Sequence, residues 1–69
     1  MAADSKIKTP EEILELALKR EQSAFQFYSN MLSHAGGVDV VRTLIEQLKD
    51  EELKHVRLVE KKLMQLRLG

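Results

Sequence analysis

The sequence of 69 residues contains no cysteine and no tryptophan, and it holds only one proline and three glycines. Without cysteine the chain cannot form a disulfide, a thiolate zinc site or an iron–sulfur centre. Aromatic residues are also few, since Phe25, Phe27 and Tyr28 are the whole set. Packing must therefore come from Leu, Ile, Val, Met and Ala, a composition typical of helices. Any metal chemistry must use carboxylates and histidine.

An excess of one charge and long apolar runs are absent as well. Eleven basic residues balance eleven acidic ones, and the two kinds are interleaved along the chain. This pattern argues against nucleic acid or a membrane surface as a partner. No apolar run reaches the roughly 18 residues of a membrane span, and residues 1–8 lack the apolar core of a signal peptide. We therefore expect a cytoplasmic protein.

The short length predicts self-association, because a domain of this size buries too little surface to be more than marginally stable alone. Residues 1–8 show no periodicity and are expected to form a flexible tail. Residues 9–69 are expected to form one helical hairpin.

The start of the first helix has a clear signature. Thr9 suits the N-cap, Pro10 suits the first helical position, and Glu12 is placed to close a capping box with Thr9. The helix should extend to about His34, a residue that suits a capping role better than a metal-ligand role.

A short turn separates the two helices. The pair Gly36 and Gly37 should end the first helix, because glycine readily adopts the left-handed conformation that closes a helix. Asp39 is the expected N-cap of a second helix that continues to about Arg67. Two long helices joined by a turn of a few residues must lie antiparallel. The predicted fold class is all-α.

Ionisable residues occupy the middle of both apolar stripes. At about 100° per residue, Glu21 lies at the centre of the first stripe, and Glu52 and His55 lie within the second. The first stripe comprises Leu14, Ala17, Leu18, Ala24, Phe25, Tyr28 and Leu32. The second comprises Val41, Leu44, Ile45, Leu48, Val59, Leu63 and Leu66.

Buried carboxylates need a counter-charge, since an unpaired one costs several kcal/mol. Neither stripe contains Lys or Arg, so a metal ion is the expected partner. Glu21 and Glu52 are each about fifteen residues from the turn, roughly 23 Å along the helices, and are therefore level. His55 follows Glu52 by three residues and points to the same place.

One hairpin supplies two glutamates and one histidine, which is too few ligands for two metal ions. Two hairpins supply four glutamates and two histidines, the ligand set of di-iron carboxylate bundles. Four carboxylates also neutralise two divalent cations. We therefore expect a homodimer or higher homo-oligomer, a four-helix bundle, and two Fe ions per dimer, with Mn or Zn as alternatives.

The stretches Lys19–Tyr28 and Asp50–His55 resemble the ferritin-like superfamily, particularly its rubrerythrin branch and the two-helix encapsulated ferritins. The resemblance implies a ferroxidase or peroxidase-like oxidoreductase that oxidises Fe(II) with dioxygen or peroxide. It also implies Glu21 as a ligand, Glu52 as the bridging ligand and His55 as a terminal ligand. Tyr28 would lie beside the site, and a catalytic role and a purely packing role stay equally open for it. Likeness to encapsulated ferritins adds an enclosing protein shell as a partner.

Other readings of the pattern stay open. The inward Glu and His side chains could instead fix the register of a non-enzymatic helical-hairpin oligomerisation module. A zinc or manganese site without redox chemistry would use the same ligands. Four further apolar residues widen the arc of the first helix, either as core or, as we favour, as a second interface between dimers. They are Ile13, Leu16, Phe27 and Met31.

Overall fold

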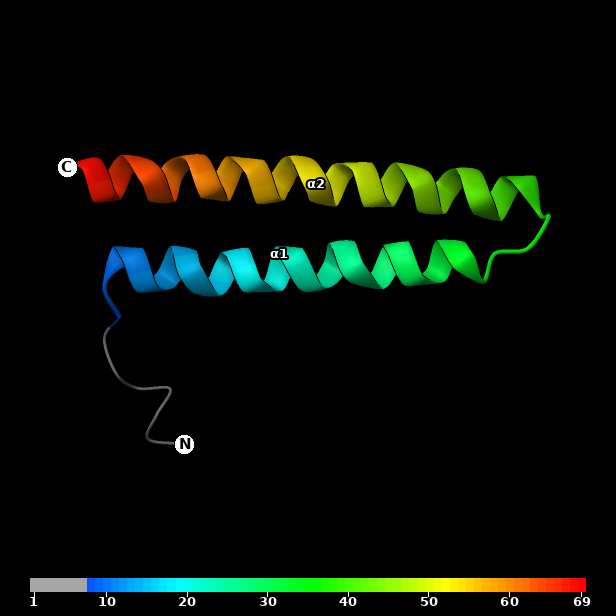
Figure 1. The fold of residues 1–69 in the computed structure, drawn as a ribbon, viewed down its shortest axis with the longest axis horizontal. Coiled ribbons are helices and arrows are strands. Elements are labelled where there is room, and N and C mark those ends of the chain that lie inside the picture. The colour runs from blue at the N-terminus through cyan, green and yellow to red at the C-terminus, as the bar shows by residue number, and fades with distance from the viewer. Residues whose placement is uncertain (1–7) are drawn as a thin grey trace, which may run out of the picture.

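The computed structural model describes residues 8–69, which form two antiparallel helices joined by a short turn (Figure 1). Helix α1 comprises Pro10–Ser33 and helix α2 comprises Asp39–Leu68. The predicted all-α hairpin is therefore confirmed. Apart from Lys8, the predicted tail lies outside the described residues. Neither helix is long and apolar enough to cross a membrane.

Helix α1 begins with the predicted capping box. The Glu12 amide donates to Thr9 Oγ1 over 3.1 Å, and the Thr9 amide donates to Glu12 Oε1 over 2.9 Å. Pro10 occupies the first turn, where its missing amide proton is not needed. The capping bonds satisfy two donors that the helix start would otherwise leave unpaired.

The turn between the helices differs from the prediction at one residue. His34 caps α1, and its Nδ1 lies 2.8 Å from the Asn30 carbonyl oxygen. Gly36 has a φ of 65°, the left-handed conformation that favours glycine. The prediction of Asp39 as N-cap is wrong, because Val38 holds the cap position and makes no side-chain capping bond. Asp39 is the first helical residue, where its charge favours the positive end of α2.

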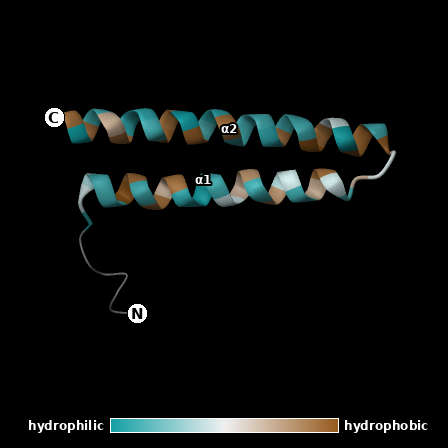
Figure 2. Ribbon diagram, viewed as in Figure 1, coloured by the Kyte–Doolittle hydropathy of each residue, from teal (hydrophilic) through white to brown (hydrophobic). Residues whose placement is uncertain are grey.

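The core between the helices is small. Its buried residues among those described are Ile45, Val56 and Leu63, all from α2. Ile45 and Leu63 belong to the predicted stripe, but Val56 does not, and Leu44 of that stripe is 52% exposed. The stripe prediction was therefore partly wrong. Apolar residues recur along both helices (Figure 2) and cover more than one side of α2, whereas a hairpin partner covers one side only.

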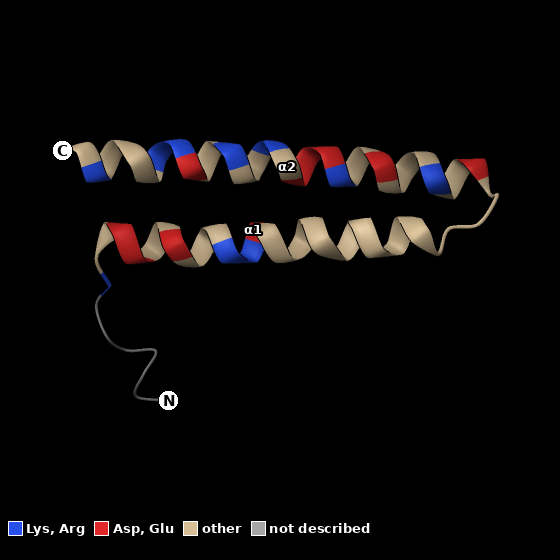
Figure 3. Ribbon diagram, viewed as in Figure 1, with Lys and Arg blue, Asp and Glu red and all other residues tan. Residues whose placement is uncertain are grey.

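The two broad faces of the hairpin differ in chemistry. On one, Arg67 donates to Glu11 and Glu15 over 2.7 and 2.8 Å, and Lys49 lies 5.7 Å from the centre of the Phe25 ring. We call this the charged face. The Arg67 contacts link the half of α2 that is rich in basic residues to the acidic start of α1 (Figure 3).

At about 100° per residue, a second set of side chains lies on the side of the hairpin opposite the charged face. We call this the apolar face. Its members are Ile13, Ala17, Ala24 and Met31 of α1, and Leu44, Leu48, His55 and Leu58 of α2. Ile13, Leu44 and Leu58 are each more than half exposed, which leaves a broad apolar surface open on an otherwise charged molecule.

Candidate metal centre

Three potential metal ligands meet midway along the hairpin. Glu21 comes from α1, and Glu52 and His55 come from α2. His55 Nδ1 lies 3.3 Å from Glu21 Oε1 and 3.6 Å from Glu52 Oε2. One donor atom from each residue lies within 4.8 Å of the other two. The two helices thus place residues 31 and 34 positions apart in the sequence side by side.

Local helix geometry accounts for the grouping. Glu52 and His55 are three residues apart, so their side chains leave α2 in nearly the same direction. The buried Val56 fixes the rotation of α2 at this level, because its side chain must face α1. Glu52 therefore faces α1 as well, and His55 is turned towards the apolar face.

The cluster is enclosed on one side and open on the other. The side chains of Glu21 and Glu52 are 28% and 18% exposed, whereas that of His55 is 50% exposed. Glu52 Oε2 is buried and has no hydrogen-bond partner among the described residues. Its 3.6 Å separation from His55 Nδ1 is too long for a hydrogen bond. A buried oxygen without a partner is costly unless another group, such as a cation, binds it.

The carboxyl groups of Glu21 and Glu52 repel each other when both are ionised. The neighbouring Glu21 carboxyl raises the pKa of Glu52 when the two groups share one proton, and burial and the Glu21 charge act in the same direction. The shared proton lowers the pKa of Glu21, opposed by desolvation and assisted by His55. The pair thus favours holding one proton between them. A divalent cation would relieve the same repulsion more completely.

The donor set fits iron, manganese or zinc. Carboxylate oxygens and an imidazole nitrogen are ligands that all three ions accept, and the absence of thiolates removes the softest alternatives. No other group of three or more His, Asp and Glu residues within positions 8–69 could hold a metal ion. In this part of the chain, the sequence reasoning therefore missed no such cluster.

Tyr28 makes different contacts from those expected of a residue at the site. Its ring packs edge-on against Phe27, with 5.3 Å between the centroids and 71° between the planes. Its hydroxyl makes no hydrogen bond with the residues that the structure describes. The role assigned to Tyr28 therefore stays a prediction.

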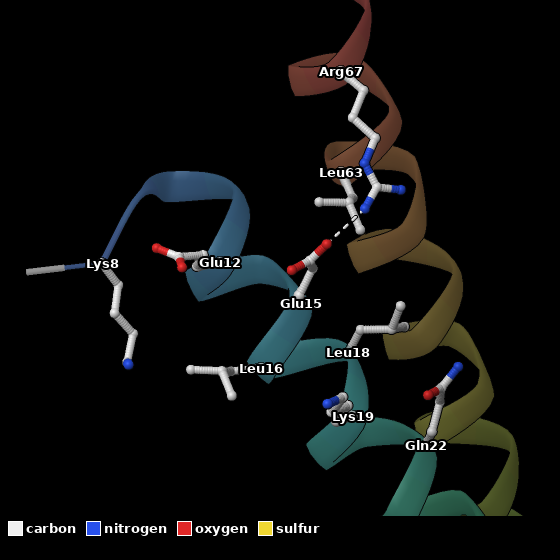
Figure 4. Close-up of a pocket in the computed structure, with 9 residues that line it drawn as sticks. All are labelled: Lys8, Glu12, Glu15, Leu16, Leu18, Lys19, Gln22, Leu63 and Arg67. Atoms are coloured by element: carbon white, nitrogen blue, oxygen red, sulfur yellow. Dashed lines mark hydrogen bonds and ion pairs between the residues drawn. The ribbon is translucent and has the colours of Figure 1, made fainter. Parts of the chain in front are cut away.

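A groove near one end of the hairpin lies away from the cluster. It is an open depression of about 600 Å³ near the start of α1, and the ion pair between Glu15 and Arg67 crosses it (Figure 4). Leu16 and Leu63 contribute apolar surface, while Lys8, Glu12 and Lys19 contribute mixed charge. None of the three cluster residues lines it.

Comparison with known proteins identifies a family that matches most of the chain. A family model described as Rubrerythrin matches residues 12–69, which is well over half of the chain and includes the whole cluster. No curated protein and no solved structure was found to match. The narrower likeness to encapsulated ferritins stays a prediction.

Proposed function

The chain belongs to the rubrerythrin family, and from this premise we propose that it oxidises Fe(II) with dioxygen or peroxide at a di-iron site shared between two copies. Family membership supports the coarser description, an iron-binding protein of the di-iron carboxylate type. The reaction and the sharing of the site are our proposal.

The cluster of Glu21, Glu52 and His55 is the observation on which the proposal rests. Three donors from two helices lie within 4.8 Å of one another, and a buried oxygen of Glu52 lacks a partner. A hairpin that used these residues only for packing would gain nothing from placing two carboxylates side by side. Their mutual repulsion is explained if a cation binds between them.

A second copy completes the ligand count. Each hairpin provides two carboxylates and one imidazole, so two hairpins provide four carboxylates and two imidazoles for two ions. His55 is turned towards the apolar face, and the exposed apolar side chains of that face favour burial against another chain. A copy docked there would bury Ile13, Leu44 and Leu58 while bringing its own cluster to this one.

In this arrangement the residues have separate roles. Glu52, the most enclosed ligand, would bridge the two ions, and Glu21 and His55 would each bind one. Bound iron would supply the one-electron chemistry that carboxylate and histidine side chains lack. The carboxylates would release their shared proton on binding and hold the charge near neutrality. The surrounding Val56 and the docked apolar faces would exclude water.

The experiment compares Glu52→Ala with Glu51→Ala. The two glutamates are adjacent, but Glu51 is exposed and lies outside the cluster. Iron content per chain and the rate of Fe(II) oxidation are measured for both variants and for the wild type. We expect Glu52→Ala to lose both, and Glu51→Ala to keep both. Equal iron loading in the three proteins would refute the assignment.

A second outcome would support the metal site but refute the proposed oxidation of Fe(II). If Glu52→Ala loses bound metal while the wild type binds iron without oxidising it, the cluster is a metal site of a non-redox protein. Replacing Fe(II) with Zn(II) in the same titration then shows whether the site prefers zinc.

A further inference from the structure

The side of α2 that points away from α1 carries an ordered series of exposed residues. At about 100° per residue they form one stripe along the helix, roughly 100–160° round from the buried Ile45 and on the side away from Leu44 and His55. We call it the outer strip. In chain order its members are Asp39, Thr43, Glu46, Asp50, Arg57, Lys61, Met64 and Leu68, all of them exposed.

The charges of the outer strip are segregated. Glu46 and Asp50 form its acidic half, and Arg57 and Lys61 form its basic half, within a helix whose overall charge changes in the same direction (Figure 3). None of these four residues makes an ion pair with another described residue. Their exposed charges are therefore available to a partner.

This order works against the helix itself. Glu46 and Asp50 are four residues apart, as are Arg57 and Lys61, and like charges at this spacing repel across one helical turn. The helix dipole favours acidic residues at the first turn and basic residues at the last, but its effect does not reach the middle of a helix. Asp50 and Arg57 lie close to the middle of α2. Opposite charges at the same spacing, Arg42 with Glu46 and Asp50 with Lys54, offset this repulsion, so the helix itself does not require the segregation along the outer strip.

The acidic and basic halves mirror each other. Glu46 and Lys61 are equally far from a point between Leu53 and Lys54, and so are Asp50 and Arg57. We propose that the outer strip binds the outer strip of a second copy, antiparallel and related by a two-fold axis through that point. Each acidic residue then lies opposite a basic residue of the other copy, giving four ion pairs in an isologous interface.

The outer strip is separate from the apolar face, where the proposed metal-sharing copy docks. His55 and Leu44 lie on one side of α2, and Glu46 and Arg57 lie on nearly the opposite side. The two interfaces can therefore form together. The outer strip would thus connect one metal-sharing dimer to another. The inference adds a second contact to the proposed function and does not need metal for its own formation.

Such a contact should be weak and sensitive to salt. Exposed ion pairs contribute little individually, because water and mobile ions screen them. The Debye length falls from about 10 Å at 0.1 M salt to about 3 Å at 1 M. We therefore expect the contact at low ionic strength and its loss at high ionic strength.

Two double variants test the proposal. Glu46→Lys with Asp50→Lys makes the strip entirely basic, and Arg57→Glu with Lys61→Glu makes it entirely acidic. Sedimentation velocity at 20 mM and 500 mM NaCl reports the mass of each protein, alone and mixed in equal amounts. We expect the wild type and the mixture to reach the larger assembly at low salt. Each variant alone should stop at the smaller one.

A control pair places new charges elsewhere. Gln22→Lys with Gln26→Lys adds basic residues to exposed positions of α1 and should leave the larger assembly intact. Circular dichroism checks that every variant is helical. A wild type whose mass does not depend on salt, or a mixture that fails to recover the larger assembly, would overturn the proposal.

Iron content measured on the same samples separates the two hypotheses. Strip variants that keep wild-type iron per chain but lose the larger assembly support the strip alone. A wild-type protein that contains no iron would count against the metal site. It would leave the conclusion about the outer strip unaffected.

Discussion

Replacing Glu52 with glutamine should have opposite effects on the metal-free and the metal-bound protein. The substitution keeps the shape of the side chain but removes its charge. A raised pKa means that stability gained from protonated Glu52 is lost as pH rises through the folded-state value. The ionised form thus weakens the metal-free fold at neutral pH. We expect the metal-free variant to melt at the wild-type temperature or higher.

With metal the order should reverse. A ligand that binds only the folded state adds about 2.7 kcal/mol at a concentration 100 times its Kd. Losing a group that merely supports a metal ligand costs about 10–100-fold in affinity, and losing a direct ligand should cost no less. At 100-fold weaker affinity the same metal concentration adds only about 0.4 kcal/mol. The difference of about 2.3 kcal/mol corresponds to roughly 10–20 °C in Tm for a domain of this size.

Thermal melting followed by circular dichroism measures both effects at a fixed chain concentration. Mn(II) or Zn(II) can replace Fe(II) to avoid oxidation during the scan. The matched control is Glu51→Gln, which removes a carboxylate one residue away and should keep the full metal-dependent rise. If the Glu52→Gln protein shows the wild-type rise, Glu52 is not a ligand. If the wild type shows no rise, the cluster does not bind these metals.

Further predictions concern the fold. Thr9→Ala removes the capping bond to Glu12 and should lower the free energy of unfolding by about 1 kcal/mol in a urea titration; an unchanged midpoint would contradict this. Hydrogen bonds from Thr9 lower the pKa of Glu12 below 4.5, so its stabilising effect is present above that pH and is lost on acidification. The Tm difference between wild type and Glu12→Gln should therefore shrink from pH 7 to pH 3. Leu63→Ala should cost about 2–5 kcal/mol, and the exposed Leu68→Ala almost nothing; similar losses would argue against the assigned core.

The helices were predictable because local signals determine them. Thr9, Pro10 and Glu12 form a start signal that needs no tertiary contact, and Gly36 supplies the backbone conformation of the turn. The start of α2 was harder to place. Asp39 is a good N-cap residue, yet Val38 occupies the cap position. The geometry of the turn decides this, and that geometry depends on how the two helices pack.

The cluster was predictable because two things determine it: the apolar periodicity of each helix, and the distance of Glu21 and Glu52 from the turn. Glu21 and Glu52 are equally far from the turn, so an antiparallel hairpin must bring them level. The rotation of α2 was not predictable from its sequence alone. Apolar residues cover two sides of this helix, and only packing against α1 selects Val56 for the core and leaves Leu44 exposed.

The central claim is that each chain carries half of a two-metal site. Native mass spectrometry with and without Fe(II), under anaerobic conditions, measures the number of chains and the number of ions in the same particle. The account predicts that iron appears only in particles with an even number of chains, at one ion per chain. Single chains that bind iron as fully as pairs do, or pairs that form but bind none, would contradict it.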